Sequence, residues 1–217
     1  MRQIIGILTL ALLLISFDLT AQYSLGGKPI SIRGEYSNLN NLNKIKKKTL
    51  PPVNVDSVKQ AEKTLQESSE KPIPPRFGVA EQVNYNLENS GRWQELADGG
   101  KVWRLKIHSP GAKSLNFIFD QYELPKGARL YIFNPKENYV LGAFSHKNNK
   151  ESGKFATDLL KGETAIIEYY EPFGGSGELS VSKVIHGYKN LPFNNHTGDG
   201  ESAPCNNDIN CPVADEW

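Results

Sequence analysis

Hydrophobic and polar residues alternate along much of the segment between residues 82 and 188. Over residues 83–87 apolar side chains alternate with asparagine, and over residues 103–107 they alternate with arginine and lysine. This period of two is typical of a β-strand that is buried on one face. Together with short apolar runs, it predicts seven strands, near residues 83–87, 103–107, 115–119, 130–133, 139–141, 165–170 and 179–185.

Turn-forming residues, chiefly glycine and proline, separate these predicted strands. The connections are too short for the crossover helices that a parallel α/β sheet needs. We therefore predict a mainly β fold, an antiparallel β-sandwich of jelly-roll or immunoglobulin-like architecture over residues 76–188. Gly174–Gly177 lies between two predicted strands, and Glu178 breaks the Gly-x-Ser-x-Gly pattern of a nucleophile turn. It is interpreted as a hairpin loop.

The segment that precedes the predicted sandwich, residues 22–75, is polar and rich in asparagine and lysine. Within it, residues 56–70 predict a helix with Asp56 as its N-cap and a thin apolar stripe. Such a helix would either lie on another domain or be partly disordered. A proline-rich run over residues 71–75 predicts a stiff spacer, and nothing before Arg76 is expected to bury a core of its own.

The first 21 residues have the pattern of a secretory signal peptide. Arg2 precedes an apolar run over residues 4–15, and residues 19–21 resemble a cleavage site. This run spans roughly 18 Å as a helix, which is short of the ~30 Å hydrocarbon core of a membrane. We therefore expect cleavage after Ala21 and a secreted, soluble protein. The alternative is an N-terminal membrane anchor.

The character of the chain changes again after Tyr188. Residues 189–204 are polar, contain glycine and proline, and show no periodicity, so they predict an exposed, disordered linker. Residues 205–217 then have the appearance of the start of another domain.

Composition narrows the classes of function. The chain has 217 residues, with 25 lysines and arginines against 24 aspartates and glutamates. The net charge of +1 argues against a nucleic-acid-binding protein, which usually carries a basic surplus on one face. The mean hydropathy of −0.47 is polar. The core is expected in the predicted sandwich, because most of the aromatic residues fall there.

Residues capable of catalysis or metal binding are sparse and scattered. The chain has four histidines, which are His108, His146, His186 and His196. They form no HExxH motif or paired spacing, and we expect solvated surface positions for them. Cys205 and Cys211 are six residues apart with no second pair, so no metal site and no cofactor is expected. Glu168 and Glu171 would face opposite sides of one strand and therefore cannot flank one substrate bond.

One predicted strand carries hydrophobic residues on both faces, and those on one face are aromatic. Tyr131 and Phe133 alternate with Leu130 and Ile132, so the two pairs face opposite sides of a sheet. An exposed aromatic face would be able to bind a sugar ring or a partner protein. We favour the alternative, in which a second sheet buries one face and a flanking segment buries the other.

Several stretches resemble the secreted lysyl endopeptidases, which are trypsin-like serine proteases that cleave after lysine. Residues 101–112, 122–133 and 167–172 resemble the propeptide domain of that family, and Val184–Tyr188 resembles the end of that domain. The most specific stretch, residues 202–212, is similar to the start of the mature protease, with its Cys-Asn-Asn-Asp-Ile-Asn-Cys-Pro sequence.

The resemblance implies the organisation of a proregion. It would comprise a signal peptide at 1–21, a polar leader at 22–75, a propeptide sandwich at 76–188, a linker at 189–204 and a truncated protease domain from 205 to 217. The catalytic triad would lie further downstream, so no catalytic residue is expected in this chain. The resemblance also implies that Cys205 and Cys211 form disulfides with downstream cysteines.

The implied function is mechanical. A sandwich tethered to the protease domain would dock on it, either as a folding aid or to hold it latent. Lys189 is the candidate self-processing site, because it begins the linker and Asn190 places no proline after it. Two other interpretations stay open. One is a secreted binding module for a glycan or cell-surface partner, and the other is a structural domain of a larger surface protein.

Overall fold

The computed structural model describes residues 23–36, 39–71, 73–136 and 138–191. Several predictions made from the sequence fall outside these residues. They are the signal peptide with its cleavage after Ala21, the linker from residue 192 onward, His196, and the two cysteines Cys205 and Cys211.

The described residues form eleven strands, one α-helix and three short 3-10 helices. The strands are β1 (Lys47–Thr49), β2 (Gly78–Asn86), β3 (Arg92–Glu95), β4 (Lys101–His108), β5 (Ser114–Glu123), β6 (Arg129–Asn134), β7 (Tyr139–Phe144), β8 (Phe155–Ala156), β9 (Leu160–Lys161), β10 (Thr164–Glu171) and β11 (Glu178–Gly187). The helices are η1 (Ile30–Ile32), η3 (Leu42–Lys44), α2 (Val55–Ser68) and η4 (His146–Asn148). All seven predicted strands are present, and the additional strands β1, β3, β8 and β9 are too short to show a period.

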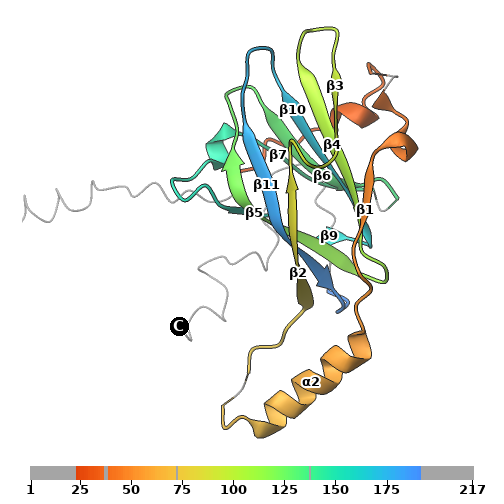
Figure 1. Cartoon of the computed structure of the whole chain (residues 1–217), viewed down its shortest axis with the longest axis vertical. Coiled ribbons are helices and arrows are strands. Elements are labelled where there is room, and N and C mark those ends of the chain that lie inside the picture. The colour runs from red at the N-terminus through yellow and green to blue at the C-terminus, as the bar shows by residue number, and fades with distance from the viewer. Residues whose placement is uncertain (1–22, 37–38, 72, 137, 192–217) are drawn as a thin grey trace, which may run out of the picture.

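The strands form two sheets that pack face to face (Figure 1). The first sheet has the order β1-β4-β10-β6-β7, with β3 also paired to β4. The second sheet has the order β2-β11-β5-β8, with β9 also paired to β5. Neighbouring strands run antiparallel, except that β1 is parallel to β4. The structure therefore confirms the predicted mainly β, antiparallel sandwich.

The connection between β10 and β11 crosses from one sheet to the other. β10 lies between β4 and β6 in the first sheet, whereas β11 lies between β2 and β5 in the second. The hairpin predicted at Gly174–Gly177 is therefore wrong, because a glycine-rich connection permits either pairing of its flanking strands or a change of sheet. Glu171 anchors this connection by accepting hydrogen bonds from the Tyr169 hydroxyl at 2.8 Å and from the Gly177 N–H at 3.0 Å.

The main hydrophobic core lies between the two sheets. Trp103, Phe117 and Tyr169 are fully buried in it, and the rings of Tyr122 and Phe155 stack with their centroids 4.4 Å apart. Burial of each large apolar side chain contributes about 1.5–3 kcal/mol. This core fixes β2 and β11, the two neighbouring strands from which the candidate site extends.

The N-terminal leader covers the outer face of the first sheet. Tyr131 and Phe133 are only 2% and 1% exposed, because they pack with Ile166 against Ile45 of the leader. Strand β1, also from the leader, extends the first sheet by pairing with β4. The favoured interpretation of this strand, with one face under a second sheet and the other under a flanking segment, is confirmed.

The contribution of the leader to the buried clusters was not predicted from the sequence, because few of its residues are apolar. Ile30 and Leu39 are buried against Leu96 and Val102 in a separate small cluster. The leader has no independent core, as expected, but its apolar residues complete the buried face of the sandwich. Packing against the sheets therefore begins well before the boundary expected at residue 76.

A buried carboxylate fastens the leader to the first sheet. Glu168 accepts hydrogen bonds from the backbone N–H groups of Ile30 at 2.5 Å and Ser31 at 3.1 Å. Beside it, the buried Arg104 guanidinium donates to the carbonyl oxygen of Leu39 at 2.7 Å. Burial raises the pKa of Glu168 to about 7, although these N–H groups and Arg104 favour its charged form. The leader is thus attached by polar as well as apolar contacts.

The predicted helix is present as α2 and projects below the sandwich, away from the core (Figure 1). Its N-cap is Asn54, whose side chain accepts a hydrogen bond from the Ser57 N–H at 3.1 Å. The prediction of Asp56 as N-cap is wrong, because Asp56 already lies in the first turn, where its charge favours the helix dipole. No residue of α2 is buried. No helix in the described part of the chain is long and apolar enough to cross a membrane.

Candidate functional site

The candidate site lies where the chain leaves β11. We call residues 188–191 the exit segment, because they follow the last residue of β11. The N–H groups of Tyr188 and Lys189 both donate to the carbonyl oxygen of Phe77, at 3.0 and 3.4 Å. Phe77 directly precedes β2, so these bonds extend the pairing of β2 with β11 beyond the end of the strand. The predicted processing residue Lys189 is therefore held just beyond the end of β11 by a hydrogen bond to the residue before β2.

Tyr188 links the exit segment to helix α2. Its side chain is buried, and its hydroxyl donates a hydrogen bond to the carboxylate of Glu62 on α2. The same hydroxyl lies 3.2 Å from the carbonyl oxygen of Arg76. Burial and, secondly, the neighbouring Glu62 carboxylate together raise the pKa of Tyr188 to about 12. The hydroxyl therefore remains protonated and able to donate at neutral pH.

The side chain of Lys189 is partly exposed and lies against the same carboxylate. Its Nζ is 4.0 Å from Oε2 of Glu62 and 5.8 Å from the centroid of the Tyr188 ring. Both contacts are weak for side chains in partial contact with water. Asn190, on the other side of the peptide bond that follows Lys189, is exposed. A protease can therefore reach one side of this bond, while the lysine side chain is engaged by the protein itself.

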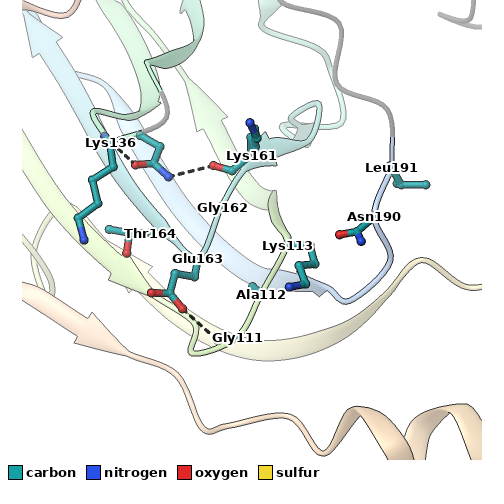
Figure 2. Close-up of a pocket in the computed structure, with 11 residues that line it drawn as sticks. Gly111, Ala112, Lys113, Lys136, Lys161, Gly162, Glu163, Thr164, Asn190 and Leu191 are labelled. Carbon is teal, nitrogen blue, oxygen red and sulfur yellow. Dashed lines mark hydrogen bonds between the residues drawn. The ribbon is translucent and has the colours of Figure 1, made fainter.

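A pocket of about 480 Å³ opens beside the far end of the exit segment. Asn190 and Leu191 form one wall, and loops from both sheets form the others (Figure 2). The remaining lining residues are Gly111, Ala112, Lys113, Asn134, Lys136, Lys161, Gly162, Glu163 and Thr164. In Figure 2 the three lysines come from separate segments and do not converge on one point.

The polar groups of this pocket are engaged mainly in holding its loops together. Glu163 accepts a hydrogen bond from the Gly111 N–H at 3.0 Å, and Asn134 donates to the carbonyl oxygen of Lys161 at 2.9 Å. Within the residues that the structure describes, no group of three or more His, Cys, Asp or Glu side chains is placed to hold a metal ion. The chemistry of this end of the molecule is therefore that of an exposed peptide segment on a rigid support.

The histidines differ from the solvated positions expected for them. His186 is 1% exposed, and its Nδ1 lies 2.8 Å from Oγ of the buried Ser109. The prediction for His186 is wrong, because it shares the inward face of β11 with Val184. His108 is half-buried with its Nδ1 3.1 Å from the Thr164 hydroxyl, and His146 is half-buried in η4. The Ser109–His186 pair is a structural contact, because neither side chain can reach a substrate.

The two glutamates of β10 lie on opposite faces of the first sheet, as expected. Glu168 faces the leader, whereas Glu171 shares the inward side with Tyr169. Glu171 is buried and forms an ion pair of 2.7 Å with Lys101. Both carboxylates therefore have structural partners and do not form a catalytic pair.

No pattern in the sequence indicates the role of Glu62. It lies in the middle of a polar helix and is separated by 126 positions from Tyr188, its hydrogen-bond partner. The link depends on β1 and β2 placing both ends of the α2 connection at the same end of the sandwich (Figure 1). A single sequence contains no local pattern that would predict such a contact.

Comparison with protein families agrees with the resemblance seen in the sequence. A family model described as the lysyl endopeptidase N-terminal domain matches residues 49–184, which is more than half of the chain. The match begins at the last residue of β1 and ends within β11, three residues before that strand ends. It includes α2 and most of both sheets. Lys189 lies just beyond it.

Proposed function

The chain belongs to the lysyl endopeptidase N-terminal domain family and carries the proregion of such a protease; from this premise we propose that the sandwich holds the protease domain latent. In this proposal the sandwich docks on a serine endopeptidase domain that follows it on the same polypeptide. Cleavage of the tether after Lys189 then lets the sandwich dissociate.

The observation that supports it best is the position of Lys189. All strands of both sheets are complete at Gly187, and the lysine follows within two residues. A cut after Lys189 would therefore release a sandwich that keeps its whole core. Lysine is also the residue after which a lysyl endopeptidase cuts, so the protease domain itself is able to perform this cleavage.

A tether is sufficient to make a modest interface effective. A short flexible linker gives an effective concentration in the mM range. An interface with a Kd of about 1 μM would then be occupied in about 99.9% of molecules while the tether is intact. After the cut, dilution below that Kd leaves the protease domain mostly free. Latency and release thus need no change in the interface itself.

The parts of the chain outside the described residues fit the same proposal. Export by a signal peptide cleaved after Ala21 would place the proregion and the protease domain in an oxidising compartment. There Cys205 and Cys211 would pair with cysteines of the protease domain. The tether between the sandwich and that domain would then be the linker that begins at Lys189.

The alternative of a sugar-binding or partner-binding module loses its structural basis. It required an exposed aromatic face on the strand that contains Tyr131 and Phe133. Both side chains are buried beneath the leader, so they offer no surface to a ligand.

The proposal is tested on the protease that carries this proregion, with Lys189→Gln as the variant. We expect the variant to keep its proregion attached and to hydrolyse a small lysyl amide at least about tenfold more slowly, because the tethered interface stays occupied. Lys126→Gln is the matched control, because Lys126 is exposed in the turn before β6. The first cut in the unmodified enzyme should fall after Lys189, which places its mature N-terminus within residues 190–204.

Two results would contradict the proposal. A mature N-terminus well away from residues 190–204 would remove Lys189 as the processing site. Full activity of the Lys189→Gln enzyme with an intact tether would remove the latency role.

A further inference from the structure

We propose that Glu62 makes helix α2 a latch over the exit segment, so that cleavage after Lys189 requires α2 to detach first. The latch is defined as the contacts of Glu62 with Tyr188 and Lys189. The biological meaning of this inference rests on the proposed function of Lys189 as the processing site. The physical claim, that α2 limits access to this bond, can be tested separately.

The latch holds the residues that a protease must engage. A protease selective for lysine has to take up the ammonium group of the lysine that precedes the cut bond. In the structure this group lies beside the Glu62 carboxylate and over the Tyr188 ring. The protease must therefore displace Glu62 before it can bind Lys189.

The backbone before the bond is engaged as well. The N–H groups of Tyr188 and Lys189 donate to Phe77, and the Tyr188 hydroxyl reaches both Glu62 and the Arg76 carbonyl oxygen. Cleavage of a hydrogen-bonded segment proceeds through its transiently opened form, so its rate follows the population of that form. Contacts that keep Tyr188 in place therefore slow cleavage after Lys189.

The geometry assigns most of this effect to the hydrogen bond between Tyr188 and Glu62. The ion pair from Lys189 is 4.0 Å long, and its side chains are 36% and 24% exposed. Exposed ion pairs of this kind contribute little. A hydrogen bond from a buried hydroxyl to a carboxylate is stronger, because one partner is charged.

Helix α2 is suited to detach without unfolding the sandwich. No residue of α2 is buried, and isolated helices of this length are marginally stable in water. The side chain of Glu62 is only 24% exposed, whereas those of Lys63 and Glu67 on the same helix are 70% and 66% exposed. Glu62 also carries the hydrogen bond and the ion pair that join α2 to the sandwich. Opening therefore breaks few contacts and leaves the core intact.

The test follows cleavage of the purified full chain by an added lysine-specific endopeptidase. Initial rates of cleavage after Lys189 and after Lys126 are measured together by mass spectrometry. Lys126 lies in an exposed turn remote from α2 in sequence and serves as the internal reference. The variants are Glu62→Ala and Tyr188→Phe. Glu67→Ala is the matched control, because Glu67 lies on the same helix and pairs only within it in the described contacts.

We expect Glu62→Ala to accelerate cleavage after Lys189 about tenfold relative to cleavage after Lys126. Tyr188→Phe should accelerate it about fivefold, because it removes the hydrogen bond but not the ion pair. Glu67→Ala should leave the ratio unchanged within twofold. Hydrogen exchange should show faster exchange of the Tyr188 and Lys189 amides in the Glu62→Ala chain, with the strands of the core unchanged. This second readout excludes general unfolding as the cause.

Equal ratios for Glu62→Ala and the unmodified chain would overturn the latch. The same conclusion would follow if Glu67→Ala accelerated cleavage as much as Glu62→Ala. Failure of the proposed function has a different signature, because a mature N-terminus well away from residues 190–204 says nothing about these ratios. The two ideas can therefore fail independently.

Discussion

The leader has two parts, the stretch before α2 and α2 itself, and they contact the sandwich in different ways. The part before α2 packs apolar side chains against the first sheet, and its backbone is hydrogen-bonded to the buried Glu168. Helix α2 has no buried residue and is joined to the exit segment through Glu62. The comparison indicates that one half of the segment is part of the fold, whereas the other half is an attachment that can open.

The largest difference in stability between the two regions is expected when a leucine is replaced by alanine in each. Leu39 of the leader is fully buried against the first sheet, and Leu65 is 45% exposed on α2. We expect Leu39→Ala to lower the free energy of unfolding by about 2–5 kcal/mol, and Leu65→Ala to change it by less than about 0.5 kcal/mol. Urea denaturation followed by tryptophan fluorescence measures both values. Similar losses at the two positions would contradict the comparison.

The next difference concerns pH and the attachment of the leader. In the native state the pKa of Glu168 is raised from its ordinary 4.5 to about 7 by burial. The native state keeps a proton that the unfolded chain releases, so stability falls as the pH rises from about 4.5 to about 7. The fall is at most about 3.5 kcal/mol, at about 1.4 kcal/mol per unit of pKa.

This pH dependence is measured by urea denaturation at pH 5 and pH 8. Glu168→Gln should reduce the difference between the two pH values, because the amide does not titrate and still offers an oxygen to the leader. The matched control is Glu178→Gln, at an exposed position of β11. A Glu168→Gln chain with the same pH dependence as the unmodified chain would show that another group is responsible.

A smaller global effect is expected for the attachment of α2. Glu62→Ala and Tyr188→Phe should each lower the free energy of unfolding by no more than about 1.5 kcal/mol, because the bond lies outside the core and a tenfold change in opening corresponds to about 1.4 kcal/mol. Calorimetry of the full chain measures this value. A loss comparable to that of Leu39→Ala would mean that α2 is part of the fold and would contradict an attachment that opens.

The smallest effect on stability is expected at the processing residue itself. Lys189→Gln should change the free energy of unfolding by less than about 0.5 kcal/mol, since its ion pair is long and partly exposed. The same urea denaturation checks it. A loss above about 1.5 kcal/mol would exceed what an exposed ion pair contributes and would make Lys189 a structural residue.

The longer strands could be predicted from the sequence, because burial on one face produces an alternation of apolar and polar residues. The sequence was insufficient for β8, where Phe155–Ala156 is too short to show a period. The change of sheet after β10 was also hidden, because Gly174–Gly177 favours a turn without specifying its partners. Pairing between distant strands is decided by the whole core.

Residue-level predictions succeeded where the pattern was local. The burial of Tyr131 and Phe133 followed from a strand with aromatic residues on one face and aliphatic residues on the other, which indicates that both faces are covered. The Asp56 cap missed by two positions, because Asn54 is equally able to cap and precedes it. The contact of Glu62 with Tyr188 had no local signature at all. Long-range polar contacts of this kind become visible only when the fold is known.

The measurement that tests the central claim most directly is inhibition in trans. The folded chain with Lys189→Gln is added to an active lysyl endopeptidase of this family, and initial rates on a small lysyl amide are recorded. Our account predicts saturable inhibition with a constant in the region of about 1 μM, as a tethered latency domain requires. A trypsin-fold protease from outside the family should be unaffected. Undiminished activity at about 100 μM of folded chain, about a hundredfold above that constant, would contradict the account.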